Sequence, residues 1–357
     1  MNTPTRLACA VFAIAGASSV AAQSSVQIYG RMNTSVEHQK HGDISATGLA
    51  SNSSFLGFQI KEDLGQGLKL GVVLEAGLEA DTGSGVDGKG LDFMRHSELN
   101  LSGRAGMLRM GAFDSVSYTT LIKPVSLHND DAGSSANLFD FTYKKQNILA
   151  YRTPNWSGWT AEVQRNFGEK QVYEDTLIDD GGWDLGVNYA QGPWGLGFAY
   201  GLSKESLVPV EAKFRDKYWG ARVSYVASNW ELAAHYVRFS RIRDISDEDG
   251  LLHGHSETDQ LRLAGVYRWG ASELHANVAK HRMRLEHYAL PGMLEMREPG
   301  PTTTQWTVAY HYNLSARSKV YALFSKSNNS APGGTIAKAE EWEPKFQAFG
   351  IGVRHIF

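Results

Sequence analysis

The chain has very little cysteine: Cys9 is the one cysteine among 357 residues. It lies in an N-terminal segment that we expect to be removed. The remaining chain therefore has no means of forming a disulfide, a thiolate nucleophile or a thiolate metal site. Long apolar runs are also lacking, since no later stretch approaches the ~20 apolar residues of a membrane-spanning helix. Proline is scarce at 10 residues, and no Pro-rich or Ser-rich run marks a linker, so we expect a single domain over residues 23–357.

The first 22 residues have the features of a secretory signal peptide. Arg6 supplies a positive charge, residues 7–17 are apolar, and Val20, Ala21 and Ala22 form a small-residue cleavage site. Cleavage after Ala22 leaves 357 − 22 = 335 residues. Arg6 also stands three residues before Cys9, where a lipoprotein site needs leucine, which argues against a lipid anchor. The alternative is a buried N-terminal helix.

Apolar residues recur with a period of two, which is typical of β-strands. The C-terminal stretch places Phe349, Ile351, Val353 and Phe357 on one side, and small or basic residues on the other. In a soluble protein an exposed apolar strand of this kind would be an aggregation-prone edge. In a membrane barrel it is the closing strand, with its apolar side against lipid. The first strand, from Val26 to about Glu37, alternates in the same way.

Short and long connections alternate along the chain. Short turns follow one another at 62–67, 102–106, 154–158, 190–193, 227–229, 269–272 and 315–317. Between them we expect long polar loops at 38–52, 81–91, 114–145, 168–182, 203–216, 240–258, 287–302 and 327–344. Aromatic residues gather beside the turns, as in the two interfacial girdles of a barrel. We therefore predict an all-β fold, a transmembrane antiparallel β-barrel of about sixteen strands; a soluble β-sandwich is the alternative.

The loop at 114–145 is the longest connection, and it is rich in apolar residues such as Leu121, Ile122 and Val125. Loops of this length are usually functional or disordered. We expect it to fold into the lumen, with its acids Asp130, Asp131 and Asp140 opposite basic residues of the wall. A loop that caps the outside of the barrel is the alternative.

Charges of both signs lie on the polar side of the strands. The basic candidates are Arg31, Lys61, Lys69, Arg109, Arg222, Arg262 and Arg354, and the acidic ones are Glu75, Glu98, Glu162, Glu231 and Glu273. Arg31, Lys61, Lys69, Arg109 and Arg262 are the preferred pore residues, together with the loop acids. For each of them, a solvated wall position without a role in selectivity is the alternative, because salt screens charges over ~8 Å.

Other chemistries find little support. There is no Gly-x-Ser-x-Gly motif, and the three polar-side histidines His235, His275 and His311 are not accompanied by an evident nucleophile. The stretch 247–255 carries acids and two histidines, but a solvated loop explains it better than a metal site. No basic patch with stacking aromatics indicates nucleic acid. We expect no enzyme activity, no cofactor and no bound metal.

Several segments, taken in order, resemble the general porins of β-proteobacteria and Neisseria. They are 24–30 (SSVQIYG), 56–58 (LGF), 62–65 (EDLG), 67–69 (GLK), the residues Asn147, Tyr151, Pro154 and Gly158, and 352–355 (GVRH) with terminal Phe357. The resemblance covers the whole mature chain. It implies a homotrimer of sixteen-stranded outer-membrane barrels, embedded among lipid and lipopolysaccharide, that pass ions and small hydrophilic solutes. It also implies a third loop inside the lumen, and recognition of the last strand, ending in Phe357, by the barrel-assembly machinery.

The sequence departs from this family at positions that usually carry basic residues. Phe55 stands where an arginine commonly precedes Leu-Gly-Phe, and Ala112 replaces the arginine of a Gly-Arg-Gln segment. At a third position, two residues before Asn147, Lys145 stands where the family often has arginine and keeps the positive charge. We therefore expect only a weak preference for anions. A solute-specific channel, or an outer-membrane barrel enzyme, is the alternative function.

Overall fold

The computed structural model describes residues 24–86, 90–125, 146–168, 171–173, 176–208, 212–247, 250–290, 293–328 and 345–357. The expected signal peptide, the acids Asp130, Asp131 and Asp140, and most of the loop at 327–344 lie outside these residues. Within them, no helix is long and apolar enough to cross a membrane.

Nearly all of the described chain is β-strand. The strands are β1 Ser25–His41, β2 Ile44–Ser51, β3 Ser54–Gly65, β4 Leu68–Leu78, β5 His96–Gly103, β6 Gly106–Ala112, β7 Ile148–Arg152, β8 Trp159–Asn166, β9 Gln171–Tyr173, β10 Thr176–Gln191, β11 Trp194–Val208, β12 Ala212–Val226, β13 Trp230–Asp247, β14 Gly250–Trp269, β15 Ser272–Leu290, β16 Met293–Asn313, β17 Ser318–Ser327 and β18 Phe346–Ile356. Two short helical turns, η2 Tyr118–Ile122 and η3 Lys123–Val125, follow β6.

These 18 segments form one antiparallel sheet that closes on itself. β2 and β3 pair with successive parts of β1, and β8 and β9 pair with successive parts of β10. The segments β2 and β3 therefore form one strand of the barrel with a break in it, and so do β8 and β9. The barrel therefore has 18 − 2 = 16 strands. β1 pairs with β18 from Arg31↔Ile356 to His41↔Phe346, which closes the cylinder. The predicted fold and strand number are confirmed.

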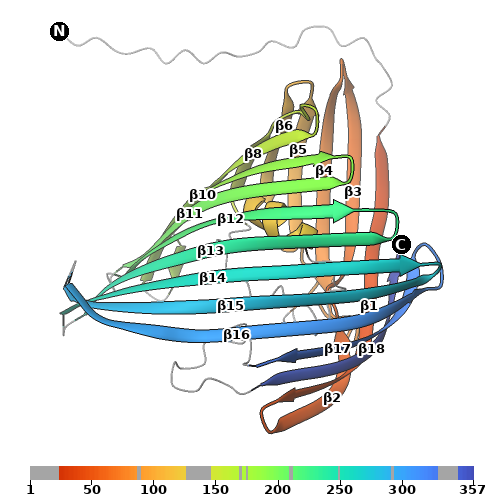
Figure 1. Ribbon diagram of the computed structural model, residues 1–357. Helices are drawn as coiled ribbons and strands as arrows, with labels where there is room; N and C mark the ends of the chain where they lie inside the picture. The colour runs from red at the N-terminus through yellow and green to blue at the C-terminus, as the bar shows by residue number, and fades with distance from the viewer. Residues whose placement is uncertain are drawn as a thin grey trace, which may run out of the picture.

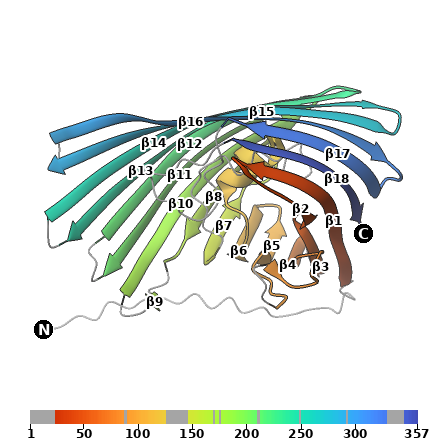
Figure 2. The same cartoon turned by 90° about the horizontal axis from the view of Figure 1, so that it is seen from below.

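The wall is taller on one side than on the other. β10–β16 have 15 to 21 residues each, whereas β5–β8 have 5 to 8. Figure 1 shows the long strands β10–β16 running side by side across the front, with β3–β6 behind them. In Figure 2 the helical turns lie between these two walls.

Several connections that were predicted as long loops are largely strand. β9–β16 extend through most of 168–182, 203–216, 240–258 and 287–302, and β1 and β2 occupy most of 38–52. The prediction was wrong there because the strands rise beyond the apolar band. Water or polar neighbours then meet both faces, so the alternation of apolar and polar residues disappears while the backbone pairing continues.

Aromatic side chains mark two levels on the outside of the barrel. Near the short turns, ring contacts join neighbouring strands, such as Trp159–Tyr189 at 4.8 Å, Trp194–Tyr225 at 4.7 Å and Trp230–Tyr267 at 4.4 Å between ring centroids. Higher on the wall, Trp219 contacts Tyr236 at 5.5 Å and Trp306 contacts Phe324 at 5.3 Å. Amphipathic rings at two levels, with apolar residues between them, match the girdles expected at the two membrane interfaces.

Candidate functional site

The candidate functional site is the inner wall of the barrel, whose side chains are polar. In β1 the alternate residues Asn33, Ser35 and Glu37 are at most 3% exposed, while Val26 and Ile28 on the opposite face are 67% and 61% exposed. This arrangement is the reverse of that in a soluble protein. Enclosed polar groups and exposed apolar ones are what a wall needs when it has lipid outside and water inside.

Charges of both signs occur on the inward face of the described strands. The bases are Arg31, Lys61, Lys69, Arg109, Arg152, Arg222, Arg241, Arg243, Arg262, Arg268, Lys319 and Arg354. The acids are Glu37, Asp63, Glu75, Glu98, Glu162, Asp184, Glu205, Asp216, Glu231 and Glu273. Counting the described side chains, the excess is 12 − 10 = 2 positive charges. The inner wall is therefore only slightly basic.

Arg109 lies in a cluster whose charges cancel. Its guanidinium contacts Glu98 and Glu162, each with a closest N–O distance of 2.6 Å. Arg152 contacts the other oxygen of Glu162, also at 2.6 Å. The Arg109 guanidinium also lies 4.0 Å from the centre of the Phe113 ring. Four neighbouring strands, β5 to β8, are cross-linked in this way, and two bases face two acids.

A second balanced cluster lies across β13–β17, close to the short turns. Arg268 contacts Glu231 at 2.6 Å and lies 3.8 Å from Glu273. Lys319 Nζ lies 3.1 Å from Glu273 Oε2. Arg354 is the strand partner of Lys319 in the sheet. From β13 to β17 the charged side chains thus alternate in sign, and Arg354 on β18 adds one further positive charge beside Lys319.

The first part of the loop at 114–145 packs against the inward side chains of the tall wall. Arg222 Nε donates a hydrogen bond to the backbone oxygen of Thr120 at 2.7 Å, and Asn188 Nδ2 donates to its hydroxyl at 3.1 Å. His235 Nδ1 lies 2.9 Å from the backbone oxygen of Leu121. Thr120 and Leu121 are each 1% exposed. The structure describes this segment as far as Val125, and the later part of the loop lies outside the described residues.

Glycines in three neighbouring strands make room for this segment. A Cβ atom at Gly186 would lie 2.5 Å from Thr120 Oγ1, and one at Gly220 would lie 2.7 Å from Leu121 Cδ1. At Gly197, a Cβ would lie 2.9 Å from the backbone oxygen of Thr120. A side chain at any of these positions would require the neighbouring atoms of the segment or of the wall to shift. The spacing of these glycines in β10, β11 and β12 carried no recognisable signal in the sequence.

The predicted pore residues occupy different environments. Arg31 donates to the backbone oxygen of Ser53 at 2.7 Å, and Arg109 lies in the neutral cluster of β5–β8. Lys61 and Lys69 are exposed beside the turn between β3 and β4, and Arg262 is fully buried against the inner wall. The structure therefore does not bring these five residues together at one point.

Sequence reasoning missed several charged wall residues. The main ones are Arg152, Arg241, Arg268, Lys319, Asp184 and Asp216. Applying the two-residue alternation to every strand would have found Arg152, Arg268 and Lys319. Asp216 and Arg241 lie in segments that were predicted as loops. They contact each other at 2.7 Å, on the inward face of β12 and β13.

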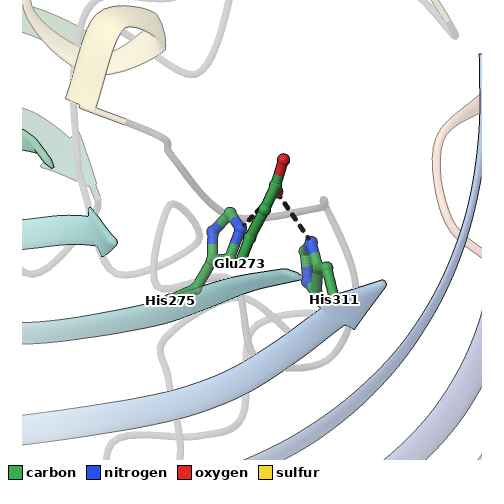
Figure 3. Close-up of side chains that lie close together, drawn as sticks. All are labelled: Glu273, His275 and His311. Atoms are coloured by element: carbon green, nitrogen blue, oxygen red, sulfur yellow. Dashed lines mark hydrogen bonds and ion pairs between the residues drawn. The ribbon is translucent and has the colours of Figure 1, made fainter. Parts of the chain in front are cut away.

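One group of side chains on the inner wall has the composition of a metal site. Glu273, His275 and His311 place their potential ligand atoms within 4.8 Å of one another (Figure 3). The segment 247–255, which the sequence analysis weighed as a metal site and interpreted as a solvated loop, falls largely outside the described side chains. His255 is described, and it contacts Ser240 and Glu286.

Comparisons with known proteins give a consistent result. The sequence model of a family described as Gram-negative porin matches residues 8–332. Outer membrane porin protein 32 of Delftia acidovorans is 30% identical to this chain, over 98% of this chain and 99% of that protein.

Two solved structures share the fold. The anion-selective porin from Comamonas acidovorans superposes with a TM-score of 0.65 at 22% identity, covering 94% of this chain and all of that chain. The trimer form of OmpT, an outer membrane protein of Vibrio cholerae, gives a TM-score of 0.64 at 16% identity, with 94% and 99% of the two chains covered.

Proposed function

Because the chain belongs to the Gram-negative porin family, we propose that it is a passive diffusion channel of the outer membrane with a weak preference for anions. The observation that carries this proposal is the reversed arrangement of the sixteen-stranded barrel, with apolar residues outside and charges of both signs inside. A multi-pass outer-membrane barrel of this kind needs no nucleophile; it needs a bore and an electric field across it. The family is one of channels, and we propose no enzymatic activity.

The test is conductance in planar lipid bilayers. Refolded protein should give stepwise, ohmic increases in current that do not saturate with any one solute. Current that a single small solute blocks in a saturable way would instead indicate a solute-specific channel. The absence of any conductance by a correctly folded barrel would contradict the channel function.

The anion preference is supported by the small basic excess of the described inner wall and by the similarity of the fold to that of the anion-selective porin from Comamonas acidovorans. The preference should be weak, because the Arg109 and Glu273 clusters are balanced and mobile salt screens charges over ~8 Å. We propose that Arg31, Lys61, Lys69, Arg109 and Arg262 contribute to this field.

The loop acids Asp130, Asp131 and Asp140 are proposed to face those bases and to narrow the bore. Support comes from the segment before them, which is held on the inner wall through Thr120 and Leu121. Replacing Asp130 and Asp131 together with asparagine should shift the reversal potential further toward anions. An unchanged reversal potential in that double variant would place both aspartates away from the ion path.

We propose that the protein assembles as a homotrimer through the side of the barrel formed by the short strands β5–β8. The described outward side chains of β5–β7 include no charged residue; among them are Leu99, Leu108, Met110 and Tyr151. The Vibrio relative is described in a trimer form. Chemical cross-linking of the folded protein in detergent should give products of up to three copies and no larger ones. Folded protein that remains monomeric after cross-linking would contradict this assembly.

The outward face of the tall wall is proposed to bind the phosphate groups of lipopolysaccharide. At and above the level of the upper aromatic residues, β11–β17 carry nine outward bases among the described side chains: Lys204, Lys213, Arg215, Lys217, Arg238, Lys280, Arg282, Arg284 and Lys326. They carry four outward acids: Asp244, Glu257, Asp259 and Glu286. The excess is 9 − 4 = 5 positive charges, which suits an anionic lipid surface.

The lipopolysaccharide proposal is tested on the purified protein. Replacing Lys280 and Arg282 with glutamine should reduce binding to vesicles that contain lipopolysaccharide, with little change for vesicles of neutral lipid. Replacing the inward Lys61 and Lys69 is the matched control. Equal binding by both double variants would contradict the proposal.

The last part of the proposal concerns export of the chain and its insertion into the outer membrane. We propose that residues 1–22 are a signal peptide removed after Ala22, and that the last strand, ending in Phe357, is recognised by the barrel-assembly machinery. The backbone of Phe357 exchanges two hydrogen bonds with Gly30, both of 3.1 Å, so the terminal residue is part of the seam. Deleting Phe357 should reduce the yield of folded protein in the outer membrane; an unchanged yield would contradict the role of this residue.

A further inference from the structure

His275 and His311 lie side by side on the inner wall, on β15 and β16. Their rings are stacked with a centroid distance of 4.0 Å and an angle of 28° between planes. The two side chains are 5% and 1% exposed. Glu273 precedes His275 by two residues on the same face and is directly opposite His311 in the sheet. Figure 3 shows the carboxylate extending past both imidazole rings.

The distances among these groups suit a common ion. Glu273 Oε2 lies 2.9 Å from His275 Nε2 and 3.7 Å from His311 Nδ1. Around a tetrahedral ion with bonds of about 2.0–2.2 Å, neighbouring ligand atoms lie about 3.4 Å apart. The two observed separations lie on either side of that value. All three ligand atoms lie within 4.8 Å of one another. Side-chain movements that bring each pair to about 3.4 Å would allow one ion to bind all three residues, with a fourth position left for water.

We propose that Glu273, His275 and His311 form a binding site for a divalent transition-metal cation, on the channel wall near the short turns. Two imidazole nitrogens and one carboxylate oxygen favour Zn²⁺, Ni²⁺ or Cu²⁺ over the oxygen-seeking Ca²⁺ and Mg²⁺. Among these ions, Cu²⁺ binds a given nitrogen and oxygen site most tightly. The metal chemistry of this site does not depend on the proposed channel function.

Two bases that contact the carboxylate moderate the affinity of this site. Lys319 Nζ lies 3.1 Å from Glu273 Oε2, and Arg268 Nε lies 3.8 Å from Oε1. Asn313 Nδ2 donates a hydrogen bond to Oε1 at 2.9 Å and holds the carboxylate in place. A metal ion bound to Oε2 would lie close to the Lys319 ammonium, and the two positive charges would repel each other. Lys319 therefore competes with the metal, and its removal should strengthen metal binding.

The experiment is a titration of the folded, untagged barrel with ZnCl₂, in which isothermal titration calorimetry measures the binding. We expect one saturable site per chain. His275→Gln and His311→Gln should each weaken zinc binding at least about 10-fold, since losing even an outer partner of a metal ligand costs about that much. Lys319→Gln should tighten it. His255→Gln, which removes a histidine paired with Glu286 elsewhere, is the matched control and should leave binding unchanged.

Copper provides a measurement that needs no variant. The electron paramagnetic resonance spectrum of Cu²⁺ bound to the wild-type barrel should show hyperfine coupling from two imidazole nitrogens. The absence of saturable zinc binding would overturn the proposal, as would equal binding by wild type and His311→Gln, or a copper spectrum without nitrogen coupling. Heat-modifiable mobility on gels reports which variants are folded, so a misfolded variant is not mistaken for the loss of a site.

Discussion

At the scale of single residues, the seam of the barrel depends on a glycine. Gly30 faces outward on β1, and the ring of Phe357 lies over it. A Cβ atom at Gly30 would lie 2.5 Å from the Phe357 ring and 2.6 Å from the backbone oxygen of Phe55. The ring can turn aside, but the backbone of the neighbouring strand cannot move without breaking its pairing. The position therefore requires glycine for steric reasons.

Gly30→Val should lower the stability of the folded barrel by about 1–3 kcal/mol, the usual cost of inserting volume into a packed site. Gly48→Val on β2 is the control, because a Cβ atom there meets nothing within 4 Å. Urea-induced unfolding in lipid vesicles, followed by tryptophan fluorescence, measures both. Equal midpoints for the two variants would show that the Phe357 ring does not restrict position 30.

At the scale of elements, the contact between the loop segment and the tall wall can be captured covalently. A Cβ atom at Gly186 would lie 3.5 Å from Thr120 Cβ, and disulfides join residues whose Cβ atoms are about 3.5–4.5 Å apart. Gly186→Cys combined with Thr120→Cys should therefore form a disulfide during refolding, detected as a mobility shift that reductant abolishes. The pair Gly48→Cys and Thr120→Cys should stay reduced. A reduced first pair would mean that the segment leaves the wall in solution.

The two faces of β4 should differ in their tolerance of charge. Val72 pairs with Ile60 and Leu99, whereas Val73 pairs with Gln59 and Glu98 on the inward face. Val72→Arg places a charge on the apolar face, where the cost near mid-bilayer is roughly 2–4 kcal/mol. Val73→Arg gains an acidic neighbour and should fold nearly as well as wild type. Folded yields in lipid vesicles measure both variants, and similar losses would mean that the register is shifted by one residue.

At the scale of the whole molecule, selectivity should follow the inner charges rather than the net charge. The chain has a formal net charge of −3, yet its described inner wall has a small basic excess. Reversal potentials in a salt gradient should therefore indicate weak anion preference. Replacing the exposed inward pair Lys61 and Lys69 with glutamine should reduce it, and replacing the outward pair Lys280 and Arg282 should not. Strong cation preference in the wild type would refute the role of the wall bases.

The sequence by itself determined the class of fold and, where the apolar and polar residues alternate, which face of a strand points outward. A two-residue period, with apolar residues on one side, is a local property. The first strand, which begins near Val26, and the last strand, which ends near Ile356, were therefore predictable without tertiary contacts. Once the periodicity faded, as in 203–216 and 240–258, prediction failed, because a strand that meets polar surroundings on both faces carries no such pattern.

Only the tertiary structure decided which side chains meet. Arg109 was recognisable as an inward base, but its contacts with Glu98 and Glu162, the latter 53 residues away, depend on the order in which strands close. The same holds for the Glu273, His275 and His311 group, and for the glycines that receive Thr120 and Leu121. Except for neighbours on one strand, such as Glu273 and His275, these contacts join residues of different strands. Their geometry is fixed by strand register and barrel closure, which no local pattern of residues encodes.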